Sequence, residues 1–123
     1  MKRMRKDVGT TQKFVLLSFT RDKGEPVLND AAIRAAMIDE RLRPISKDEF
    51  IVFYHEVLGG RKPEICIAMF GNTARGPAES GSFAGVPYLN TDGEIEVIQN
   101  WTRGNTGDQW DDGWEFLLVP AVV

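Results

Sequence analysis

Three tryptophans and three aspartates gather near the end of the chain, in a stretch that combines stacking groups with negative charge. The stretch is WTRGNTGDQWDDGW, residues 101–114, and the chain has no other tryptophan. An exposed indole flanked by carboxylates suits a basic partner or a ligand ring, because it offers a stacking surface within a negative field. We therefore predict a binding site on this stretch and an adjoining loop, formed by Asn105, Asp108, Trp110, Asp111, Asp112 and Arg75.

The three tryptophans divide into two groups if this stretch connects two terminal strands. With residues 95–101 and 114–119 paired, Trp101 and Trp114 stand at the strand ends and pack in the core. Trp110 then lies exposed on the connecting loop, where a partner can bury it. The alternative is that all three indoles close the end of the core.

Histidine and cysteine offer little material for catalysis or metal binding. His55 is the only histidine and Cys66 the only cysteine, which excludes a disulfide within the chain and a zinc site of four cysteines. On a strand, His55 and Glu56 would point to opposite faces. Cys66 lies between two isoleucines, as a small buried apolar residue does. We predict a non-enzymatic protein without catalytic residues, metal or cofactor.

Two glycine loops carry the alternative prediction, a site for a small ligand. The sequence GNT occurs at 71–73 and 104–106, and Arg75 with nearby loop amides offers positive groups to an anion. Neither loop has the glycine spacing of a nucleotide-binding motif, and DQWDDG lacks the order of a calcium-binding loop. The alternative function is a small-ligand or nucleotide-binding, sequestering domain, or a small hydrolase, that uses these loops.

Charge is distributed unevenly along the chain. Residues 1–43 contain ten Lys or Arg and six Asp or Glu, a balance of +4, whereas residues 44–123 contain five and twelve, a balance of −7. A negative field repels nucleic-acid phosphates and attracts a basic surface. The sequence therefore predicts a protein partner with a basic surface and argues against direct nucleic-acid binding.

The basic start of the chain, MKRMRK, invites comparison with a signal peptide. The apolar run that follows, FVLLSF, has six residues, fewer than the ~7–15 of a signal-peptide core. No run approaches the ~20 apolar residues of a membrane span. We predict that residues 1–12 form a flexible basic tail, that the protein does not associate with membranes, and that it is cytoplasmic, which its single cysteine also suits.

Two segments have clear secondary-structure signals. Residues 13–20, KFVLLSFT, form an apolar run that ends in a charged turn, which predicts a buried strand. Residues 29–42, NDAAIRAAMIDERL, begin with a capping Asn or Asp and contain four alanines, the best helix formers. They predict a helix with its apolar side at Ile33, Met37 and Leu42, ended by Pro44.

Residues 46–58 fit two structures. Ser46 and Glu49 have the spacing of a capping box, and an apolar stripe from Phe50 to Leu58 fits a helix that ends at a glycine. Residues 50–54, FIVFY, are instead five strand-favouring residues, followed by a tight connection and a partner strand. We prefer the strand hairpin, although the sequence leaves both structures open.

The rest of the chain alternates between loops and extended segments. GNTARGPAESGSFAG, residues 71–85, predicts a long glycine-rich loop, and such loops are usually functional or disordered. Extended structure resumes with VPYLNTDGEIEVIQNW and returns with WEFLLVP. Together the elements predict one α+β domain over residues 13–123, with an antiparallel or mixed sheet of about five strands and one or two helices packed on one face.

A resemblance to a known family rests on residues 87–114. These residues resemble the end of a small phage-borne domain family that sequesters nucleotide signals against Thoeris immunity. The family's opening helix, with its following glycine and R-x-x-W element, has no counterpart here. The resemblance implies the nucleotide-sequestering alternative, and it is carried by Pro87, Tyr88, Asp92, Gly93, Trp101, Asp108 and Trp114.

Taken together, these patterns predict a small acidic binding or inhibitor protein. It would act through a protein–protein interface on the tryptophan-bearing stretch, in a regulatory or phage counter-defence role. The acidic balance of residues 44–123 and the lack of a complete catalytic set in the sequence are the observations behind this prediction.

Overall fold

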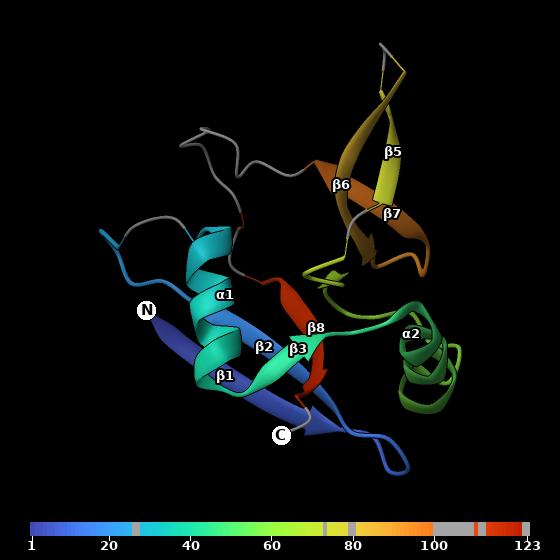
Figure 1. The fold of residues 1–123 in the computed structure, drawn as a ribbon, viewed down its shortest axis with the longest axis horizontal. Coiled ribbons are helices and arrows are strands. Elements are labelled where there is room, and N and C mark those ends of the chain that lie inside the picture. The colour runs from blue at the N-terminus through green and yellow to red at the C-terminus, as the bar shows by residue number, and fades with distance from the viewer. Residues whose placement is uncertain (26–27, 73, 79–80, 100–109, 111–112, 122–123) are drawn as a thin grey trace.

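The chain folds into one mixed sheet with two helices, an α+β fold as predicted (Figure 1). The computed structural model describes residues 1–25, 28–72, 74–78, 81–99, 110 and 113–121, without the side chains of 75–78, 81–84 and 99. Its elements in chain order are β1 Lys2–Val8, β2 Phe14–Thr20, α1 Asp30–Asp39, β3 Leu42–Pro44, α2 Lys47–Phe53, the π-helical turn η1 Tyr54–Leu58, β4 Ile67–Ala68, β5 Ala74–Ala78, β6 Gly81–Leu89, β7 Ile95–Gln99 and β8 Glu115–Pro120.

The sheet has more strands than the five or so expected from the sequence. Eight described strands join in the order β1-β2-β8-β4-β6-β5, with β3 paired to β8 and β7 paired to β6. Strand β2 occupies one edge of β8, so β3 and β4 share its other edge, β3 antiparallel and β4 parallel. Among the described residues, no helix is long and apolar enough to span a membrane.

The two helices cover opposite faces of the sheet, which corrects the prediction that they pack on one face. Along β2, Val15 and Leu17 face the cluster that contains α1, whereas Phe14 and Leu16 face the cluster that contains α2. Strand β8 alternates in the same way. The continuous apolar run of the predicted first strand is the signature of a strand that is buried on both faces.

Helix α1 confirms the helix predicted at 29–42, although it is shorter. The Asn29 side chain accepts a hydrogen bond from the Ala32 amide at 2.9 Å and so caps the helix start. The helix ends at Asp39, well before the proline, because Arg41 adopts a positive φ of 58°. Leu42 consequently belongs to β3 and not to the helix.

Residues 47–58 are helical, so the preferred strand hairpin is wrong. The capping box decides the structure at its start: the Glu49 amide donates to the Ser46 hydroxyl at 3.1 Å, and the Ser46 amide donates to the Glu49 carboxylate at 2.9 Å. The helix turns the apolar stripe toward the sheet, where Phe53 is fully buried. Gly59, in the left-handed region, ends it.

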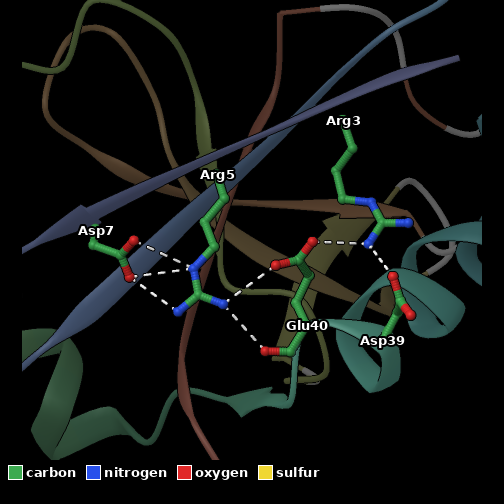
Figure 2. Close-up of polar contacts among 5 residues, drawn as sticks. All are labelled: Arg3, Arg5, Asp7, Asp39 and Glu40. Carbon is green, nitrogen blue, oxygen red and sulfur yellow. Dashed lines mark hydrogen bonds and ion pairs between the residues drawn. The ribbon is translucent and has the colours of Figure 1, made fainter.

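The N-terminal segment, expected as a flexible basic tail, is strand β1. It pairs with β2 over its whole length. Its arginines reach the end of α1: Arg3 donates to Asp39 at 2.7 Å and to Glu40 at 2.9 Å, and Arg5 lies 3.3 Å from Glu40 (Figure 2). Tertiary ion pairs and a strand partner therefore hold a segment whose sequence predicts a solvated arm. Charged residues also suit this edge strand, since they discourage pairing with another chain.

The glycine-rich segment 71–85, expected as a long loop, contains paired strands. Residues 74–78 pair with residues 81–85, so β5 and β6 form a hairpin that extends from the sheet (Figure 1). Gly85 permits close backbone contact, because a Cβ atom there would lie 2.2 Å from the Ile98 carbonyl oxygen. The predicted pairing of 95–101 with 114–119 is also wrong. Strand β7 pairs with β6, and β4 lies between β6 and β8 in the sheet.

The ion pair between Arg43 and Glu49 ties α2 to β3 and makes folding pH-dependent. Hydrogen bonds from the Arg43 guanidinium, both 2.9 Å, lower the pKa of Glu49 from 4.5 to about 2. The stabilisation is therefore present above pH 4.5 and is lost as the pH falls toward 2. We expect Glu49→Gln to lower the free energy of unfolding at pH 7 by on the order of 1 kcal/mol.

Denaturant unfolding of both proteins between pH 7 and 2 measures this effect. The difference between wild type and Glu49→Gln should shrink as the pH falls through the interval in which Glu49 is protonated. A difference that stays constant to pH 2 would contradict the assignment. Asp48→Asn, next to Glu49 on the exposed side of α2, is the control, and its effect should be small.

Candidate functional site

Trp110, the centre of the predicted binding site, is a core residue. Its side chain is 4 % exposed, and its indole N–H donates to the Asp30 carboxylate at 2.8 Å. The ring packs edge-on against Trp114 and Phe116, each 5.0 Å away between centroids. The prediction of an exposed Trp110 is therefore wrong: a large ring gains most by burial once its N–H has a partner, and Asp30 at the start of α1 supplies one.

The other predicted site residues do not assemble into a site within the described part of the chain. Arg75 lies in β5, where only its backbone is described. Trp114, expected in the core, is partly buried beside Tyr88, whose ring centroid lies 5.0 Å away. The remaining members of the predicted site, Asn105, Asp108, Asp111 and Asp112, lie outside the described residues, as does Trp101, which was expected in the core.

The described surface carries an apolar groove between α2 and β7, which we call the α2–β7 groove. It consists of two adjoining hollows of about 440 and 300 Å³ that share Phe50, Ile51 and Ile95. The larger hollow is also lined by Ile45, Ser46, Lys47, Met69, Asn72, Ala74 and Pro87, and the smaller one by Tyr54, His55, Leu89 and Gly93.

Two exposed isoleucines from different elements line both hollows of this groove. Ile51 on α2 is 47 % exposed, and Ile95 on β7 is 52 % exposed. On α2, the buried side carries Phe53, so Ile51 falls beside the apolar stripe and not on it. On β7, Ile95 stands opposite the fully buried Leu89, at the margin where the cover by α2 ends. The lip of the groove thus consists of aliphatic surface that the fold leaves in solvent.

The end of the groove near α2's first turn is fixed by a side-chain clamp. The Asn72 amide donates to the carbonyl oxygens of Ile45 and Met69, at 2.8 and 3.3 Å, and so holds the turn between β4 and β5. Gly71 in the same turn has a φ of +91°, and a Cβ atom there would lie 2.3 Å from a Pro44 side-chain carbon. These contacts give the groove a fixed wall.

The opposite end of the groove is fixed by the turn between β6 and β7. The Asn90 side-chain oxygen accepts from the amides of Asp92 and Glu94, both at 2.9 Å. Glu96 accepts from the Tyr88 hydroxyl at 2.7 Å, and this hydrogen bond raises the pKa of Tyr88 to about 12. The turn therefore presents carboxylates from a rigid hairpin.

The chemistry of the groove favours binding through apolar contacts. His55 at one end is exposed, and its ring packs edge-on against Tyr54 at 5.5 Å. Its neighbour Glu56 instead accepts a hydrogen bond from Thr11. Among the described residues, no group of three or more His, Cys, Asp or Glu side chains could hold a metal ion.

A second cavity, of about 460 Å³, lies under η1 and carries basic residues. Two of its three cations are already engaged: Lys6 lies 3.4 Å from Glu115, and the Arg61 guanidinium donates to carbonyl oxygens at the end of η1. Glu64 also lines this cavity, so its charge is mixed. These pairings make it a poorer candidate for an anionic ligand than its basic residues alone would indicate.

Sequence reasoning missed the isoleucines of the groove for an identifiable reason. If residues 46–58 form a helix, Ile51 lies beside the apolar stripe, and this position indicates that it is exposed. The strand structure that we preferred gives no such indication. For Ile95, alternation with Glu94 and Glu96 predicts a buried side chain, but the residue is 52 % exposed; no neighbouring residue in the sequence shows where the cover by α2 ends.

Comparisons of the chain with protein-family models, with curated proteins and with solved structures found no match. The resemblance to the nucleotide-sequestering phage family therefore gains no support from them.

Burial of Trp110 generates a stability prediction. Trp110→Ala should lower the free energy of unfolding by ~3–5 kcal/mol, as truncation of a buried tryptophan does. Trp110→Phe keeps an aromatic ring but leaves the buried Asp30 carboxylate without its donor, which costs about 1–3 kcal/mol. Chemical denaturation measures both. Ile38→Ala, at a residue 79 % exposed, is the surface control, and a Trp110→Ala as stable as that control would contradict burial.

Proposed function

We propose that this chain is a non-enzymatic binding protein that acts through a protein–protein interface, and that the α2–β7 groove is the interface. The observation that carries the proposal is the pair Ile51 and Ile95, about half exposed on either side of one apolar hollow. Single exposed apolar residues are ordinary, but two that line one concave surface are typical of an interaction site.

Burial of this lip would contribute a useful share of a binding energy. Burying an aliphatic side chain completely is worth ~1.5–3 kcal/mol, so two half-exposed isoleucines offer about that amount together. The rigid hairpin and the clamped turn support the proposal further, because preformed walls lower the ordering cost of binding. An inhibitory or regulatory role, in the cytoplasm, is the biological form we expect for such a surface.

The proposal moves the interface away from the tryptophan-bearing stretch. The Trp110 indole N–H donates to Asp30, and its ring is buried in the core. The ring therefore cannot contact a partner unless the protein unfolds locally. The small-ligand alternative placed its site at the two GNT loops with Arg75. Arg75 lies in the paired strand β5, while residues 73 and 104–106 lie outside the described residues. No described feature favours the alternative over the groove.

Charge insertion into the groove tests the proposal. Ile51→Lys and Ile95→Lys should each reduce capture of the natural partner by at least about tenfold, because a lysine in an apolar interface must be desolvated. Ile38→Lys is the matched control: this residue on α1 is 79 % exposed, and it does not line the groove. Each protein is immobilised, and proteins captured from a lysate of the source organism are quantified by mass spectrometry.

Two outcomes would contradict the groove as the interface. One is retention of the same partners by both groove variants. The other is an equal loss with Ile38→Lys, which would indicate an effect of charge in general. Thermal unfolding of all three variants accompanies the capture, so that a folding defect is separated from a binding defect.

A further inference from the structure

Within the described part of the chain, one backbone edge of strand β7, beside the groove, pairs with no strand. One edge of β7 pairs with β6, and no described strand pairs with the other. The Asn90 amide donates to the Glu94 carbonyl oxygen at 2.9 Å, and the Met69 amide donates to the carbonyl oxygen of Pro87, the residue opposite Val97. Hydrogen-bonding directions alternate along a strand, so Val97 points its N–H and C=O groups away from β6.

The side chains of β7 differ between its two faces. Ile95 stands opposite Leu89, on the face that α2 covers and the groove opens. Glu96 stands opposite Tyr88 on the other face, next to the partly buried Ile98. A strand added to this edge would therefore meet aliphatic surface on one face and a carboxylate on the other.

The described acids around β7 form no ion pair, although the Lys62 side chain lies near the turn at Gly93. Residues 85–99 contain three acids and no Lys or Arg. Glu96 accepts only from the neutral donors Tyr88 and Asn90, and none of the three acids has an ion-pair partner among the described residues. Lys47 lines the larger hollow, one helical turn before Ile51, and it does not line the smaller one. The edge is thus complementary to a positively charged segment.

Strand β1, another outer strand of the sheet, lacks this character. Strand β1 carries four basic side chains, Lys2, Arg3, Arg5 and Lys6, and such residues protect an edge from pairing. Strand β7 has aliphatic and acidic residues instead. Strands β1 and β7 therefore differ in how well they can accept an added strand.

We propose that an extended segment of the partner adds to the open edge of β7 as a further strand, with alternate residues apolar and basic. The apolar residues lie on the groove face beside Ile51 and Ile95, and the basic residues lie beside Glu96. Main-chain hydrogen bonds to Val97 supply affinity, and the alternation supplies specificity. This inference rests on the proposed function of the groove and names the kind of partner that fills it.

A designed peptide tests the inference without knowledge of the natural partner. The probe is a labelled, end-capped ten-residue peptide of alternating valine and lysine, and binding is followed by fluorescence anisotropy at low ionic strength. The controls are a valine–glutamate alternation and a peptide with the probe's composition arranged in two blocks. We expect the alternating lysine peptide to bind at least about tenfold more tightly than either control. Equal binding of the block peptide would overturn the inference.

Val97 provides a matched pair of protein variants. Val97→Pro removes the outward N–H, which an edge strand tolerates, while Val97→Ala keeps it. We expect Val97→Pro to weaken probe binding by about tenfold or more, and Val97→Ala by no more than about threefold. If Val97→Pro does not fold, a probe with N-methylated backbone amides tests the same hydrogen bonds on wild-type protein. Undiminished binding of the methylated probe would overturn strand addition.

The outcomes separate this inference from the proposed function. Loss of the natural partner with Ile51→Lys but not with Val97→Pro would leave the groove as the interface and overturn strand addition. Light scattering of the free protein measures its oligomeric state and so tests whether a second copy of the chain fills the edge. A dimer that Val97→Pro dissociates would overturn the inference, because the edge would then be filled by the protein itself.

Discussion

Strand β8 must be covered on both faces and both edges, and the rest of the fold follows from this requirement. Its residues from Phe116 to Val119 are all buried, and they alternate between the two apolar clusters. An unsatisfied backbone group at this depth would cost as much as a lost hydrogen bond, so both edges need strands. Strand β2 supplies one edge, and β3 and β4 divide the other. Each face needs a helix, and the chain supplies α1 and α2.

The division of the second edge explains why a groove exists. The chain must pass from β3 to β4 across one face of the sheet, and this connection contains α2 and η1. Strands β6 and β7 continue the sheet beyond β4, so α2 covers the face only in part. Phe53 fills the covered part, whereas Ile51 and Ile95 remain at its margin. The apolar surface is thus a consequence of a short helix over a wide sheet.

The fold neutralises the basic part of the sequence more than the acidic hairpin of β6 and β7. Much of the basic N-terminal segment is neutralised within the molecule, since Arg3 and Arg5 pair with Asp39 and Glu40 (Figure 2). The acids of the β6–β7 hairpin have no such partners among the described residues. The carboxylates of this hairpin therefore lie near the aliphatic lip of the groove without an ion-pair partner among the described residues.

Signals confined to a few neighbouring residues were enough to predict β2, β8 and the capped start of α1, because an apolar run or a cap acts within one turn or one strand. The sequence of 46–58 contained both a helix signal and a strand signal, and the sheet decided between them by burying Phe53. Trp110 shows the limit most clearly: its indole N–H is satisfied by Asp30, 80 residues away in the chain. Composition by itself determined that the protein is acidic, and the order of its predicted segments determined the α+β class. Which aromatic residues are buried, and which aliphatic ones remain exposed, was decided only by contacts between distant segments, since burial depends on what packs against a side chain and not on its neighbours in sequence.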